Sequence, residues 1–234
     1  MRKRLAEVIG SQAYQVTIST FHSFANRIIQ TYPESFPRII GSKPMTDVDQ
    51  ITIVESLMNT AKGISILRPF GDRFHYLRDI INAIKELKRE GITPEQFVKL
   101  VDHEQTVFDN RDDLYHAKGR FKGKMKGEHE KYQKQILKNR ELSLLYAHYQ
   151  DALSLQKLYD YEDMIMEALS AITQDESLLR TLQEQYQYVL VDEHQDTNNA
   201  QNRIVEILMS YHENPNLFIV GDEKQAIYRF QGAS

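Results

Sequence analysis

Two short apolar runs near the carboxyl end of the chain restrict its fold most. "YVLV" (188–191) and "LFIV" (217–220) stand on either side of "NNAQNRIVEILMSY" (198–211), which has the spacing of an amphipathic helix. Short continuous apolar runs separated by a helix are typical of parallel strands that are covered on both faces. The sequence therefore predicts an α/β fold built on a parallel sheet.

Both apolar runs lead directly into acidic residues. Asp192 and Glu193 follow the first run, and "GDEKQ" (221–225) follows the second. Ligands bind at the carboxyl ends of parallel strands, so these two groups are expected to face one pocket. One acid can hold a hydrated Mg²⁺ ion while its neighbour orients or deprotonates a water molecule. An ordinary polar turn or helix cap at the strand end is the alternative.

The rest of the chain has the pattern of a helical block between two α/β segments. Near the start, "YQVTIST" (14–20) alternates like a strand, and "FHSFANRIIQTY" (21–32) has helical spacing. Thr93, Pro94 and Gln96 form the pattern of a capped helix start. This order favours an insertion into an α/β domain over two tandem domains. The further helices are expected at 47–61, 72–91, 94–101, 128–158 and 159–172.

Charge is distributed unevenly along the chain. Residues 111–140 contain ten Lys and Arg against four Asp and Glu, a net charge of +6, whereas residues 160–234 contain four against fourteen, a net charge of −10. The basic stretch is interleaved with Tyr115, Phe121 and Tyr132. Such a segment can follow a phosphate backbone and stack bases. A solvated loop that leads into a helix is the alternative.

Composition excludes several classes of protein. The chain has no cysteine, which removes disulfides, thiolate metal sites and cysteine nucleophiles. No apolar run approaches the roughly 20 residues that span a bilayer. The basic start, "MRKRLAEVIG", lacks the apolar segment of a secretory signal. We therefore expect a cytoplasmic protein without a membrane partner.

Four segments resemble one family. "VLVDEHQDTNNAQ" (189–201) and "LFIVGDEKQAIYRFQGAS" (217–234) resemble motifs II and III of superfamily 1A DNA helicases, the UvrD/Rep/PcrA family. "TISTFHSFANRII" (17–29) is similar to the motif Ib region, and "LYDYEDMIMEAL" (158–169) to the segment before motif II. The resemblance implies a partial P-loop NTPase with a RecA-like parallel sheet and a mainly helical insertion. The implied division is 1–44 and 159–234 for subdomain 1A, and 45–158 for subdomain 1B.

The resemblance also implies an activity and its residues. The family's ATP-dependent helicases move 3′ to 5′ on single-stranded DNA and act at junctions with duplex DNA, which would place this protein on the bacterial nucleoid. Asp192 would bind the Mg²⁺ ion on ATP and Glu193 would activate the hydrolytic water. Gln195 and Gln225 would complete the nucleotide site. The residues implied to contact DNA are Thr20, Phe21, His22, Tyr228, Arg229 and Phe230, with Lys122, Lys124 and Lys126 facing the duplex.

One family motif is absent from the sequence. No G-x-x-x-x-G-K-[ST] phosphate loop occurs in the 234 residues, so the resemblance covers a piece from just after motif Ia through motif III. We therefore expect no ATP hydrolysis by the chain alone, and the remaining motor segments of a parent helicase as its partners. A non-catalytic nucleic-acid-binding module or remnant is one alternative. A Mg²⁺-dependent nuclease is disfavoured, because "GDEKQ" points its adjacent Glu and Lys to opposite faces.

Overall fold

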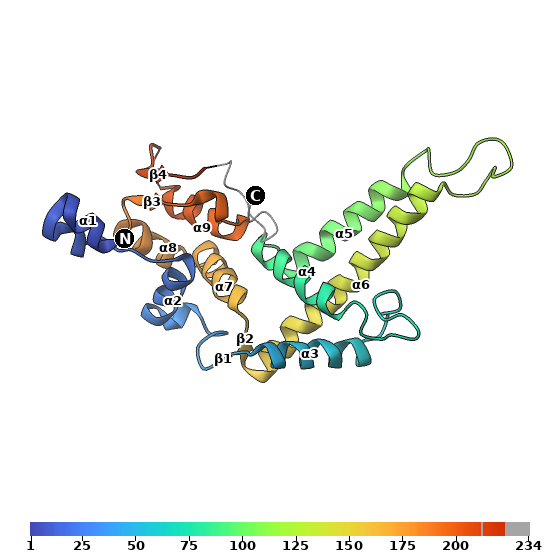
Figure 1. Ribbon diagram of the computed structural model, residues 1–234, viewed down its shortest axis with the longest axis horizontal. Coiled ribbons are helices and arrows are strands. Elements are labelled where there is room, and N and C mark those ends of the chain that lie inside the picture. The colour runs from blue at the N-terminus through green and yellow to red at the C-terminus, as the bar shows by residue number, and fades with distance from the viewer. Residues whose placement is uncertain (212, 223–234) are drawn as a thin grey trace.

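The computed structural model describes residues 1–211 and 213–222. It contains helices and two small parallel sheets (Figure 1). The helices are α1 (Arg2–Ile9), α2 (Phe21–Thr31), α3 (Asp47–Thr60), α4 (Leu77–Arg89), α5 (Pro94–Asp109), α6 (Gly127–Gln156), α7 (Tyr161–Gln174), α8 (Glu176–Gln185) and α9 (Asn199–Met209). The strands are β1 (Lys43–Pro44), β2 (Leu158–Tyr159), β3 (Val189–Val191) and β4 (Leu217–Ile219).

The predicted parallel pair of strands is confirmed. β3 and β4 pair in parallel with Leu190 opposite Phe218, and α9 connects them. The expectation that both faces are covered is wrong for this chain. Leu190 is 74% exposed and Phe218 is 63% exposed, whereas Val191 is buried. Among the described residues only one face of the pair has a core to pack on, so the other face meets solvent.

Two hydrophobic cores divide the chain. The terminal core joins α2 with α7, α8 and α9, so it draws on both ends of the sequence. The central core joins α3, α4, α5 and α6. Figure 1 shows α5 and α6 lying side by side and extending away from the terminal core, with residues 110–126 at their tip. β1 and β2 pair in parallel, so the strand that enters the helical block lies beside the strand that leaves it.

Capping side chains explain where several helices begin. Thr93 and Gln96 form the predicted capping box at the start of α5, with Pro94 in the first turn. Thr46, Asp160 and Asn198 begin α3, α7 and α9 in the same way. At the other end of α4, the amide of Gly91 (φ +70°) donates to Lys88 O and that of Ile92 to Leu87 O, both at 2.9 Å. This pair of bonds is a Schellman motif, which ends a helix at a residue with positive φ.

Three of the predicted elements differ clearly from the structure. Residues 14–20 form no strand, because no strand in the described part of the chain lies beside them to share ladder hydrogen bonds. α4 begins at Leu77 instead of residue 72, since the Asp72 carboxylate accepts from the Phe74 amide at 3.2 Å and holds a local turn. α5 continues to Asp109, beyond the predicted end at residue 101.

No helix in the described ranges is long and apolar enough to span a bilayer.

Candidate nucleotide and DNA site

The two acidic strand ends lie side by side. The ladder of β3 and β4 extends past the strands, where the Val220 amide donates to Val191 O at 2.8 Å. The His194 amide then donates to Val220 O at 3.0 Å. Asp192 and Glu193 therefore leave β3 beside the "GD" that follows β4, as expected for the carboxyl ends of parallel strands. Both acidic side chains are exposed.

Glu193 has an unusual backbone conformation. Its φ of 53° and ψ of 43° place it in the left-handed region, which costs a non-glycine residue about 1–2 kcal/mol. Its amide donates to the Asp192 carboxylate at 3.0 Å. Strained residues of this kind occur where the surrounding structure fixes the backbone, and they are common at functional sites.

Gln195 joins the first strand end to the second. Its amide nitrogen donates to the Glu193 carboxylate at 2.5 Å, and its amide oxygen accepts from the Asp222 amide at 2.9 Å. Gly221 leaves room for this contact, since a Cβ there would stand 2.7 Å from Gln195 Oε1 and 3.2 Å from its backbone nitrogen. An alanine at this position has to displace the Gln195 amide. The glycine therefore preserves the link between the two strand ends.

The donor set at the strand ends fits a hard cation that keeps other ligands. Asp192 and Glu193 offer only carboxylate oxygens, which Mg²⁺ prefers. No group of three His, Cys, Asp or Glu residues able to hold a metal by itself occurs among the described residues. Mg²⁺ normally binds to proteins through one or two carboxylates plus waters and substrate phosphates. Gln225 lies outside the described residues.

Thr20, Phe21 and His22 have three different environments. The Thr20 hydroxyl accepts from the Ser23 amide at 3.2 Å and caps α2. Phe21 is half-buried and packs against the terminal core. His22 stacks on Tyr161, with ring centroids 3.6 Å apart and ring planes inclined by 16°. Of the three, His22 has the clearest aromatic surface.

Tyr161 extends that aromatic surface into solvent. Its side chain is 62% exposed although its ring covers His22. Burial lowers the pKa of His22 to about 4, so its ring is neutral at pH 7. The pair therefore presents uncharged aromatic faces. Tyr161 was not among the residues predicted from the sequence; its position in "DYED", between two acids at the start of a helix, was the available signal.

The basic segment lies at the tip of the α5–α6 pair. Tyr115 and Met125 form an antiparallel bridge, and the His116 amide donates to Lys124 O at 3.0 Å. Lys122 and Lys124 are exposed at this tip, while Lys126 is half-buried and directly precedes α6. The exposed rings of Tyr115 and Phe121 accompany them. Cationic and aromatic groups thus share one end of the molecule.

Tyr228, Arg229 and Phe230, which are also predicted to contact DNA, lie outside the described residues.

Comparisons with known proteins agree on one family. The chain is 29% identical over 243 aligned residues to the ATP-dependent DNA helicase PcrA of Bacillus subtilis. It is 28% identical to PcrA of Staphylococcus aureus and 26% identical to the ATP-dependent DNA helicase UvrD1 of Mycobacterium bovis. Each match covers all of this chain but 26% of the relative's length. The family model of the UvrD/REP helicase N-terminal domain matches residues 1–234, and the chain therefore belongs to this family.

Proposed function

We propose that this chain is part of the motor core of an ATP-dependent DNA helicase that moves 3′ to 5′ on single-stranded DNA. In this proposal the part built on the terminal core is RecA-like subdomain 1A (1–44 and 159–234), and the helical block is subdomain 1B (45–158). The observation that carries the proposal is the pair of joined strand ends, where Gln195 holds Glu193 to the backbone of Asp222. Family membership and the names of the relatives support it.

Asp192 and Glu193 have separate roles in the proposed hydrolysis. Asp192 would hold Mg²⁺, which when bound neutralises phosphate charge on ATP. Glu193 would act on the water, because its carboxylate is exposed and its position is fixed by Gln195. The side chain of Gln225 would contact the γ-phosphate, as the resemblance implies. The chain has no glycine-rich phosphate loop, so we expect it not to hydrolyse ATP alone.

The proposed path of single-stranded DNA passes the aromatic pair. His22 and Tyr161 offer stacked, neutral rings to bases, and stacking is worth about 1–3 kcal/mol per base whatever the sequence. Tyr228, Arg229 and Phe230 are proposed to continue this path on the resemblance alone. Thr20 and Phe21 would support it from the capped start of α2. Tyr161→Ala should weaken the binding of an oligo(dT) in fluorescence anisotropy by about 5- to 150-fold.

The hairpin tip is the proposed contact with duplex DNA at a junction. Lys122→Ala, Lys124→Ala and Lys126→Ala together should lower the slope of log K against log salt by about 2–3, since each neutralised phosphate contributes about 0.9. The matched control replaces three exposed lysines elsewhere, which lowers net charge equally. These are Lys43, Lys62 and Lys99. Equal slopes for the two triple variants would reject a duplex contact at the tip.

A non-catalytic nucleic-acid-binding module remains the second candidate, because the exposed rings and lysines are sufficient for binding without hydrolysis. Magnesium-dependent nucleotide binding separates the two candidates. In the motor proposal, ADP should broaden the amide signals of residues 192–195 in NMR spectra only when Mg²⁺ is present, and Asp192→Asn should remove the effect. Unchanged spectra at millimolar Mg²⁺ and ADP, together with intact DNA binding, favour the binding module.

A further inference from the structure

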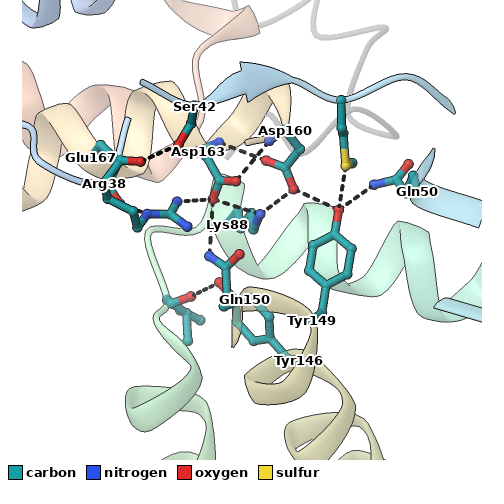
Figure 2. Close-up of polar contacts among 12 residues, drawn as sticks. Arg38, Ser42, Gln50, Lys88, Tyr146, Tyr149, Gln150, Asp160, Asp163 and Glu167 are labelled. Atoms are coloured by element: carbon teal, nitrogen blue, oxygen red, sulfur yellow. Dashed lines mark hydrogen bonds and ion pairs between the residues drawn. The ribbon is translucent and has the colours of Figure 1, made fainter. Parts of the chain in front are cut away.

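A buried lysine connects the helical block to the start of α7. Lys88, on α4, is 1% exposed, and its ammonium group contacts Asp160 and lies 2.9 Å from Asp163 Oδ1 (Figure 2). Asp160 and Asp163 are 7% and 0% exposed. A buried charge is stable in a protein only when it is paired and hydrogen-bonded. The two buried carboxylates therefore depend on Lys88 for charge compensation.

Other side chains from both cores complete this buried cluster. Gln150, on α6, donates to Asp163 Oδ1 at 3.1 Å, and Tyr149 donates to Asp160 Oδ2 at 3.1 Å. Arg38 approaches Asp163 from the other side, with its Nη2 atom 2.8 Å from Asp163 Oδ1. Burial alone would raise the pKa of Asp163, but Lys88 and Arg38 outweigh it and lower that pKa to about 2. Asp163 therefore stays ionised at neutral pH.

The same two carboxylates cap the helix that presents Tyr161. Asp163 Oδ2 accepts from the Asp160 amide at 2.9 Å, and Asp160 Oδ1 accepts from the Asp163 amide at 2.8 Å. Each carboxylate thus gives one oxygen to the capping box and the other to the cluster around Lys88. Tyr161 stands inside this box, with its ring exposed and stacked on His22. The backbone of Tyr161 is therefore fixed by two acids that Lys88 holds together.

We propose that Lys88 is a positioning residue for the DNA-facing pair of His22 and Tyr161, through which the helical block sets the geometry of that surface. This inference rests on the proposed function of the pair. Without the ammonium group, two buried carboxylates face each other and the capping box opens. The Tyr161 ring then leaves its stacked position. A second salt link from α4 runs alongside, where Lys85 Nζ lies 3.7 Å from Glu162 Oε1.

If Lys88 only stabilises the fold and does not position the pair, a different result is expected. Loss of Lys88 then lowers the stability of the whole fold, and DNA binding decreases only in proportion to the folded fraction. Glu141→Gln is the matched control, because it breaks a buried carboxylate contact inside the helical block that does not involve α7. Both variants are compared at a temperature where circular dichroism shows that they are folded.

The test is a double-mutant cycle on the full 234-residue chain with fluorescein-labelled oligo(dT). Tyr161→Ala and Lys88→Met should each weaken binding, Tyr161→Ala by about 5- to 150-fold. In the Tyr161→Ala background, Lys88→Met should change the dissociation constant less than about 2-fold, because the ring that it positions is gone. Glu141→Gln should bind as the parent chain does. Additive effects of Lys88→Met and Tyr161→Ala would overturn the inference.

An NMR measurement without DNA separates failure of the inference from failure of the proposed function. The stacked Tyr161 ring shifts the His22 ring signals, and Lys88→Met should move them toward their positions in Tyr161→Ala. If these signals stay in place, Lys88 does not position the pair. If these signals move while Tyr161→Ala binds oligo(dT) normally, Lys88 does position the pair, and it is the proposed role of the pair in DNA binding that fails. Should Lys88→Met not fold, Tyr149→Phe takes its place, since it removes one hydrogen bond to Asp160 and should shift the same signals less.

Discussion

Glu141 holds a long connection of the helical block in place. Residues 61–76, between α3 and α4, contain no regular helix or strand. Glu141, on α6, is 6% exposed, and its carboxylate accepts from the amides of Ser65, Ile66 and Leu67 at 2.8–2.9 Å. The Ser65 hydroxyl donates to it as well, at 2.8 Å. Three successive amides around one anion are a strong, charge-assisted arrangement.

Glu141→Gln keeps the shape of this side chain but removes its charge. One oxygen remains to accept from Ser65, while the new NH₂ group faces the Leu67 amide, which leaves two donors opposed. An unsatisfied buried amide costs about 1–3 kcal/mol, and the remaining bonds lose about half of their strength. We expect a loss of about 3 kcal/mol in the free energy of unfolding. For a chain of this size that loss corresponds to a decrease in Tm of about 6–12 °C.

Urea denaturation at several pH values measures this loss and its origin. Burial raises the pKa of Glu141, but the three amides and the Ser65 hydroxyl outweigh it, so its pKa is lowered in the folded chain. The stabilisation is therefore complete above the ordinary carboxyl pKa and disappears as pH falls through the lower, folded-state pKa. The difference between the parent and Glu141→Gln should shrink in acid. A loss below about 1 kcal/mol at pH 7, or one equal to that of the exposed control Glu130→Gln, refutes the reasoning.

Three further predictions concern the site and its supports. His22 should titrate near pH 4 in NMR spectra, whereas a midpoint near pH 6.5 contradicts its burial. Because the folded chain holds this ring neutral, its contribution to stability should be lost as pH falls from about 6.5 toward 4. Gly221→Ala should displace the Gln195 amide and speed hydrogen exchange at the Asp222 amide, with unchanged exchange as the opposing result. Gly91→Ala should cost about 1–2 kcal/mol in urea denaturation because of its φ of +70°, and a neutral effect speaks against the Schellman geometry.

Local signals in the sequence predicted local structure well. The Thr93 capping box depends on residues three positions apart, and its helix begins where the pattern indicates. The apolar runs predicted β3 and β4 because burial of one face is enough to produce them. The exposure of Leu190 was not predictable from its own neighbours, since it depends on which elements lie across the sheet. An apolar run indicates that at least one face of a strand is buried, but it does not show that both faces are.

The buried cluster could not be predicted from local sequence. Lys85, Lys88 and Arg89 stand close together in "IKELKRE" and look like one solvated basic face. Of these three, Lys88 contacts the buried carboxylates of Asp160 and Asp163, which are 72 and 75 positions away in the chain, while Lys85 pairs with the Glu162 carboxylate. The link from Gln195 to Asp222 also joins distant residues, 27 positions apart. Long-range contacts of this kind set both the geometry of the candidate nucleotide site and that of the aromatic pair.

ATP hydrolysis by a chimaeric helicase tests the central claim most directly. In this chimaera, residues 1–234 would replace the matching segment of the ATP-dependent DNA helicase PcrA of Bacillus subtilis, and PcrA would supply the rest of the protein. We predict hydrolysis stimulated by single-stranded DNA, and a loss of about 10²–10⁴-fold in its rate on Glu193→Gln. The exposed control Glu184→Gln should leave the rate unchanged. Undiminished hydrolysis by the Glu193→Gln chimaera would contradict the assignment of this strand end to the chemistry of a DNA motor.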